Sequence, residues 1–136
     1  MSPNQDLRIL LVDDSVGTRT LVKKMLRNLG YSEVETAGDG HEALDLILED
    51  DFDLVISDWI MPKMSGVELV EQLKKNEDTK NIPVLLVTAD DDPANIMAAL
   101  KAGADNYMCK PYDAKVLAEK IEKVFQFKEK KAQRNT

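Results

Sequence analysis

Five short apolar runs alternate along this chain with segments in which apolar residues recur at helical spacing, and this alternation restricts the fold more than any other feature. The apolar runs lie at residues 8–12, 34–37, 54–57, 83–87 and 106–109. Short apolar runs that end in turn residues are typical of strands buried in a parallel sheet. Strands that alternate with helices over short connections predict an α/β fold, a five-stranded parallel sheet with helices on both faces.

The expected helices have recognisable ends. Apolar spacing places them near residues 16–29, 43–48, 67–73, 93–102 and 114–125. The expected N-caps are Ser15, Asp92 and Asp113. Side-chain oxygens at such positions accept a backbone N–H of the first helical turn. Pro93 stands at the first helical position, which favours proline, and Gly30 and Gly103 stand where helices end.

Length and charge limit the class of protein. The 136 residues suit one compact domain at residues 7–127, after an N-terminal extension at 1–6 and before a polar tail at 128–136. A net charge of -7 argues against nucleic-acid binding, and no apolar run approaches the length of a membrane span. Cys109 is the only cysteine, so an internal disulfide is excluded and a reducing compartment is compatible. The expected location is the cytoplasm.

Polar side chains follow the strands at the points where the strands end. Asp13 and Asp14 follow the first strand, Asp58 ends the third, Thr88 the fourth and Lys110 the fifth. Parallel strands bring their carboxyl ends to one edge of the sheet, where open α/β sheets bind ligands. In the common doubly wound order 2-1-3-4-5 the first and third strands are neighbours, which predicts that the three carboxylates converge in one crevice.

Three carboxylates in a small space repel one another, so either a pKa rises or a cation is bound. Mg²⁺ is a hard cation that takes carboxylate, water and phosphate oxygens, and Lys110 supplies a positive donor for a phosphoryl group. For any single residue the simpler interpretation is that strand ends turn polar where they meet water. Acids, a hydroxyl and a lysine at four separate strand ends favour a functional site instead.

These residues resemble the receiver domain of two-component response regulators over residues 7–127. The resemblance rests on Leu11-Val12-Asp13-Asp14-Ser15, Asp58 with Met61-Pro62 and Gly66, Thr88-Ala89, Gly103-Ala104 and Lys110-Pro111. It is closest to the CheY-type single-domain regulators, given Asp58-Trp59, Tyr107 and the expectation that no output domain follows. The implied fold is flavodoxin-like (CheY-like), doubly wound in the order 2-1-3-4-5, and this order is that of the family, so its prediction rests partly on the resemblance.

The resemblance implies a role for each site residue. Asp58 accepts a phosphoryl group from a histidine kinase. The implied Mg²⁺ ligands are Asp13, acting mostly through water, Asp14, Asp58 and the backbone carbonyl of Ile60. Lys110 pairs with the phosphoryl group, and its peptide bond to Pro111 is expected to be cis.

The resemblance also implies a switch and its partners. Thr88 bonds to the phosphoryl group and Tyr107 rotates inward, which remodels the face of the fourth helix, fifth strand and fifth helix. The implied partners are a CheA-like kinase, a protein target such as a flagellar motor switch component, and a phosphatase. The protein is then a monomeric, phosphorylated signalling module rather than an enzyme, and its pathway is chemotaxis.

Other functions remain to be compared with this one. A phosphorelay intermediate or a receiver cut from a larger regulator belongs to the same class. An aspartyl-phosphate hydrolase of the haloacid dehalogenase kind needs a second acid where Ile60 stands. A flavodoxin-like FMN carrier conflicts with Asp13-Asp14, which would repel the FMN phosphate. In the family, the positions of Ile60 and Asp90 tune the attacking water, so the apolar Ile60 predicts slow self-dephosphorylation.

Overall fold

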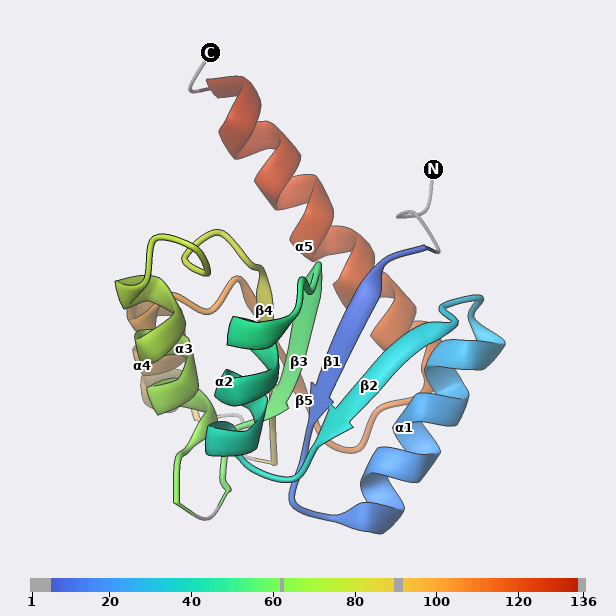
Figure 1. Ribbon diagram of the computed structural model, residues 1–136. Helices are drawn as coiled ribbons and strands as arrows, with labels where there is room; N and C mark the ends of the chain where they lie inside the picture. The colour runs from blue at the N-terminus through green and yellow to red at the C-terminus, as the bar shows by residue number, and fades with distance from the viewer. Residues whose placement is uncertain (1–5, 62, 90–91, 135–136) are drawn as a thin grey trace.

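A computed structural model describes residues 6–61, 63–89 and 92–134, with side chains up to Gln126. All pairings in the sheet are parallel and the strand order is β2-β1-β3-β4-β5, as predicted. The strands are β1 (Arg8–Val12), β2 (Glu33–Ala37), β3 (Leu54–Asp58), β4 (Val84–Thr88) and β5 (Asn106–Cys109). Figure 1 shows β1 and β3 side by side at the centre of the sheet.

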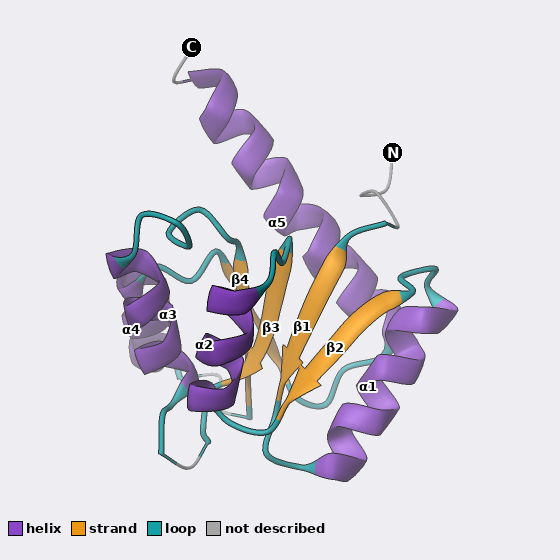
Figure 2. Ribbon diagram, viewed as in Figure 1, coloured by secondary structure: helices purple, strands orange, loops and turns teal. Residues whose placement is uncertain are grey.

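Helices cover both faces of this sheet (Figure 2). They are α1 (Val16–Asn28), α2 (Gly40–Glu49), α3 (Gly66–Lys75), α4 (Pro93–Ala102) and α5 (Ala114–Arg134). Leu10 and Leu86 belong to the core cluster with α2, α3 and α4, whereas Leu11 and Leu85 belong to the cluster with α1 and α5. Neighbouring strand residues thus point to opposite faces, and both faces are apolar, as expected for a buried parallel sheet.

The helix ends follow the predicted capping chemistry. Ser15 accepts the N–H of Thr18 at 3.2 Å, and Asp113 accepts that of Val116 at 2.9 Å. Gly30 and Gly103 have φ of 102° and 118°, a backbone conformation that glycine adopts without strain. Local side-chain chemistry therefore sets most of these boundaries.

Two boundaries differ from the expected ones. Helix α2 begins at Gly40, before its first apolar residue, because Asp39 caps it by accepting the N–H of Glu42 at 2.8 Å. The backbone of α5 continues to Arg134, so most of the polar tail prolongs a helix that projects beyond the sheet in Figure 1. Among the described residues, no helix is both long and apolar enough to cross a membrane.

Candidate functional site

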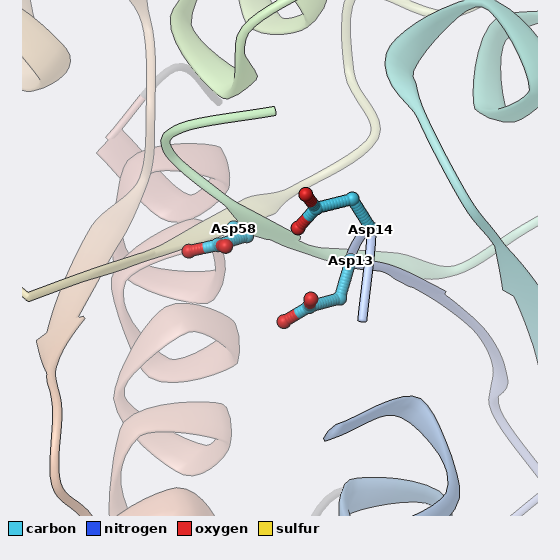
Figure 3. Close-up of side chains that lie close together, drawn as sticks. All are labelled: Asp13, Asp14 and Asp58. Carbon is cyan, nitrogen blue, oxygen red and sulfur yellow. The ribbon is translucent and has the colours of Figure 1, made fainter. Parts of the chain in front are cut away.

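Three carboxylates meet at the carboxyl edge of the sheet. Asp13 and Asp14 follow β1 and Asp58 ends β3, and these strands pair so that Val12 lies opposite Ser57. One carboxylate oxygen from each acid lies within 4.8 Å of the other two (Figure 3). Asp13 is buried, Asp58 is partly buried and Asp14 is exposed. The predicted convergence of the acids is therefore present, with one side of the cluster open to solvent.

Lys110 reaches this cluster from the end of β5, the outermost strand beside β4. Its Nζ lies 3.3 Å from Oδ1 of Asp58, and its backbone N–H donates to the carbonyl of Thr88 at 2.8 Å. The bond to Pro111 is cis, as predicted. Thr88 is buried at the end of β4, between the strands that carry Asp58 and Lys110. The hydroxyl, the lysine and the acids predicted for one edge thus occupy one region.

The electrostatics of Asp58 combine opposing effects. Burial raises the pKa of Asp58, the nearby ammonium of Lys110 lowers this pKa, and the charge of Asp13 raises it. The net shift is upward. A partly buried carboxylate among other acids is stabilised in its ionised form when a cation approaches, and this favours metal binding.

Trp59 and Ile60 form the start of the loop that leaves β3. The backbone N–H of Trp59 donates to Oδ1 of Asp58 at 3.1 Å, and 80% of the surface of Ile60 is exposed. With Thr88 and Asn95 these two residues line a hollow of about 130 Å³ in the loop that follows Asp58. Pro62 and Asp90, which the sequence analysis assigned to the motif and to the control of the attacking water, lie outside the described part of the chain.

Tyr107 stands apart from the acidic cluster. It pairs with Leu86 between β5 and β4, and its partly buried ring lies 4.8 Å from Nζ of Lys120 on α5. This location is on the face of α4, β5 and α5, where the switch was predicted.

Two residues near the cluster were missed by sequence reasoning. Burial, with the charges of Asp13 and Asp58, raises the pKa of Tyr112 to about 12, so the phenol stays neutral at physiological pH. Arg19 donates from Nη1 to the backbone carbonyl of Asp13 at 2.6 Å. Arg19 lies one helical turn after the predicted cap Ser15, a spacing that could have indicated a side chain facing the end of β1.

The donor set suits a small, hard divalent cation. Each of the three acids offers a carboxylate oxygen, and the exposed side near Asp14 leaves room for water ligands. A larger hollow, of about 460 Å³, lies beside the segments that precede β3 and β4, near Ile47, Phe52 and Ile82. It is therefore at the amino ends of these strands, away from the three acids.

A doubly wound sheet with three carboxylates, a lysine and a hydroxyl at the ends of its strands has the architecture of a receiver domain. The family model of the response regulator receiver domain matches residues 9–122, and the chain belongs to this family of two-component signalling proteins. The resemblance in the sequence is thereby confirmed.

Relatives and solved structures agree with this assignment. The chain is 40% identical over 123 residues to the chemotaxis protein CheY-3 of Vibrio cholerae serotype O1, covering 90% of this chain and 95% of that protein. The solved structure of the chemotaxis response regulator CheY4 of Vibrio cholerae superposes with a TM-score of 0.82 at 36% identity, over 87% of this chain and 98% of that one. The receiver domain of a sensor histidine kinase from Pseudomonas aeruginosa, with a magnesium ion coordinated in its active-site cleft, gives a TM-score of 0.77 at 27% identity over 85% and 93%.

Proposed function

We propose that this protein is a phosphorylation-activated response regulator of chemotaxis, in which a CheA-like histidine kinase phosphorylates Asp58. One observation carries the proposal. Asp58 ends the central strand β3 with Asp13 and Asp14 within 4.8 Å and with Nζ of Lys110 at 3.3 Å. A carboxylate flanked by metal-binding acids and a mobile ammonium is suited to accept a phosphoryl group. The similarity to the chemotaxis proteins supports the pathway.

In the proposed transfer a carboxylate oxygen of Asp58 forms a bond to phosphorus while the N–P bond of the kinase phosphohistidine breaks. The electron pair of that bond returns to the imidazole, which takes up a proton from solvent. Asp58 needs no general base, because an ionised carboxylate is already a nucleophile. The ammonium of Lys110 favours this ionised form and is placed to pair with the transferred group.

Asp13, Asp14, Asp58 and the backbone carbonyl of Ile60 would hold Mg²⁺. When bound, the cation neutralises the negative charge on the phosphoryl oxygens, which is the main need of phosphoryl transfer. Asp13 is buried and accepts the N–H of Ser15 at 2.8 Å, so it suits contact through a water molecule. Asp14 is exposed and its carboxylate is accessible. The magnesium ion in the sensor kinase receiver supports this choice of metal.

The proposed switch links the phosphoryl group to a protein target. Thr88 moves toward the phosphoryl oxygens, Tyr107 rotates into the space that Thr88 leaves, and the face of α4, β5 and α5 changes. Exposed Met97 and Leu100 on α4 offer apolar contact to a target such as a flagellar motor switch component. The same proposal places the protein in the cytoplasm as a monomer. It includes a phosphatase as a further partner and no substrate other than the phosphoryl group.

A Thr88→Ala variant tests the switch. It should still be phosphorylated at Asp58 but should lose most of the phosphorylation-dependent gain in affinity for the target. Full retention of that gain would exclude Thr88 as the switch residue.

A phosphorelay intermediate, or a receiver from a larger regulator, is the second candidate. It is favoured by the similarity to the receiver domain of a sensor histidine kinase. The distinguishing measurement is transfer from phosphorylated protein to a histidine phosphotransfer domain. Rapid onward transfer supports the relay, and target binding without onward transfer supports the chemotaxis function.

Trp59 supplies the central test, because it is the only tryptophan and its backbone N–H donates to Oδ1 of Asp58. Its fluorescence should change with added Mg²⁺ and again with a small phosphodonor or beryllofluoride. Asp58→Asn should abolish the second change, and the matched control Asp45→Asn, an exposed position on α2, should retain both. No response in the wild type, or an equal response in Asp58→Asn, would refute the proposed function.

A further inference from the structure

Asp13 is held by three hydrogen bonds from three parts of the chain. Its N–H donates to Ala37 of β2 at 3.1 Å, its carboxylate accepts the N–H of Ser15 at 2.8 Å, and its carbonyl accepts Nη1 of Arg19 at 2.6 Å. The donors of the first two bonds are backbone N–H groups, which every residue except proline supplies. The third depends on one side chain, that of Arg19 on α1.

The guanidinium of Arg19 also lies against the turn between β2 and α2. A Cβ atom added to Gly38 would lie 3.3 Å from Nη1 of Arg19 and 3.5 Å from Oε2 of Glu42. Glu42 in turn accepts the N–H of Gly38 at 2.9 Å. The absence of a side chain at residue 38 therefore leaves the space in which Arg19 reaches the end of β1.

The carbonyl that Arg19 binds belongs to the peptide unit joining Asp13 to Asp14. The orientation of this planar unit sets the backbone from which Asp14 projects its carboxylate. The side chain of Asp14 is exposed, so no surrounding core fixes it. We propose that Arg19 is a positioning residue that holds the Asp13–Asp14 peptide in the orientation the acidic cluster needs to bind a divalent cation. This inference rests on the proposed function, in which that cluster binds Mg²⁺.

Charge and geometry make opposite predictions for Arg19. A guanidinium bound to the carbonyl of Asp13 repels a cation that approaches the acidic cluster, so its charge alone would weaken metal binding and its removal would strengthen it. Positioning predicts the reverse, because an unfixed peptide must be ordered when the metal binds. Loss of a group that orients a metal ligand typically reduces metal affinity by about tenfold to hundredfold. The sign of the change therefore separates the two effects.

The experiment measures the Mg²⁺ dissociation constant from Trp59 fluorescence in the full chain. Arg19→Met should weaken Mg²⁺ binding by about tenfold, despite the loss of a repelling charge. Arg19→Lys keeps the charge but not the planar fork, and should restore part of the affinity. Gly38→Ala keeps Arg19 and crowds its Nη1, so it should also weaken binding. Arg27→Met, at an exposed position of the same helix, is the matched control and should leave the constant unchanged.

Thermal unfolding in EDTA, recorded for every variant, separates positioning from general stability. A purely structural role for Arg19 would lower the Tm of Arg19→Met and leave its Mg²⁺ constant at the wild-type value at a temperature where the protein is folded. An unchanged or tighter constant in Arg19→Met overturns the proposal. If that variant does not fold, an unchanged constant in both Arg19→Lys and Gly38→Ala overturns it. A wild type that does not respond to Mg²⁺ refutes the proposed function itself, whereas a responding wild type with an equal Arg19→Met refutes only the role of Arg19.

Discussion

On the proposed function, the side chain of Ile60 stands where it would affect the lifetime of the phosphorylated state. It lies two residues after Asp58 with 80% of its surface exposed, beside a hollow that Thr88 also lines. An apolar side chain there cannot orient a water molecule for attack on an acyl phosphate. Ile60→Asn should therefore speed self-dephosphorylation, by up to about tenfold, because an amide can hold that water. Decay of radiolabelled phosphoprotein measures the rate, and an unchanged lifetime would contradict the role of this position.

Lys63, in the loop after β3, has a φ of 70°. Left-handed backbone is costly for most L-residues, because Cβ approaches the following carbonyl oxygen, and asparagine tolerates it better. Lys63→Asn should raise the free energy of unfolding by about 0.5–1 kcal/mol, measured by urea denaturation. Lys24→Asn, the same change at an exposed site inside α1, should instead lower it by about 0.5 kcal/mol because asparagine is a weaker helix former. A destabilised Lys63→Asn would show that the loop does not carry this strain.

At the scale of elements, the start of α3 is pressed against the end of β3. A Cβ atom at Gly66 would overlap the carbonyl oxygen of Asp58 and lie 2.9 Å from Cδ2 of Leu86. The N–H of Gly66 also donates to the carbonyl of Trp59 at 2.8 Å. The start of α3 therefore fixes the backbone of Asp58, the residue proposed to accept the phosphoryl group.

Gly66→Ala should lower the free energy of unfolding by about 1–3 kcal/mol, because the strand or the helix must move. It should also reduce the Trp59 response to Mg²⁺. Gly17→Ala is the matched control, since its nearest neighbour would be Oγ of Ser15 at 3.9 Å. That change should stabilise α1 by about 0.5 kcal/mol. Equal urea midpoints for the two variants would contradict the close approach.

The elements were predictable where the signal is local. Apolar runs and caps such as Ser15 placed four of the five helices near their observed starts. The start of α2 was missed because Asp39 caps it ahead of the first apolar residue. The capping box formed by Ser65 and Glu68 on α3 was also missed, although the spacing of these two residues is a readable signal.

At the scale of the whole molecule, Arg8 ties the start of β1 to the loop before β3. Its Nη2 lies 2.8 Å from Oδ2 of Asp50, and its guanidinium lies 5.0 Å from the ring centre of Phe52. The hydrogen bond from Arg8 lowers the pKa of Asp50 from 3.8 to about 2. Because the folded pKa lies below the unfolded one, this pair adds stability above the ordinary pKa and loses it as pH falls toward about 2.

A double-mutant cycle with Arg8→Met and Asp50→Asn should therefore give a favourable coupling at neutral pH that declines in acid. Urea unfolding at pH 7 and at about pH 3 measures it, and added salt should reduce it because both side chains are partly exposed. The same cycle on the exposed pair of Lys80 and Glu77 is the control, and it should give a smaller coupling than the Arg8–Asp50 pair. A coupling that is independent of pH would contradict the assigned pKa of Asp50.

The sequence by itself determined the alternation of strands and helices, the chemistry at four strand ends and the family. These follow from burial patterns and residue types that are local in the chain. The strand order drew partly on the family resemblance and is confirmed by the pairing of β1 with β2 and β3.

Only the tertiary structure decided how the site is assembled. The sheet brings Lys110 to 3.3 Å from Asp58 although the two residues lie far apart in the chain. It buries Asp13, exposes Asp14 and brings Tyr112 within the electrostatic influence of Asp13 and Asp58. It also lets Arg19 reach the carbonyl of Asp13 through the space left at Gly38. The physical reason is that such distances depend on strand register and helix packing. Both bring together residues that are far apart in the chain, and nothing in the local sequence indicates that these residues will be in contact.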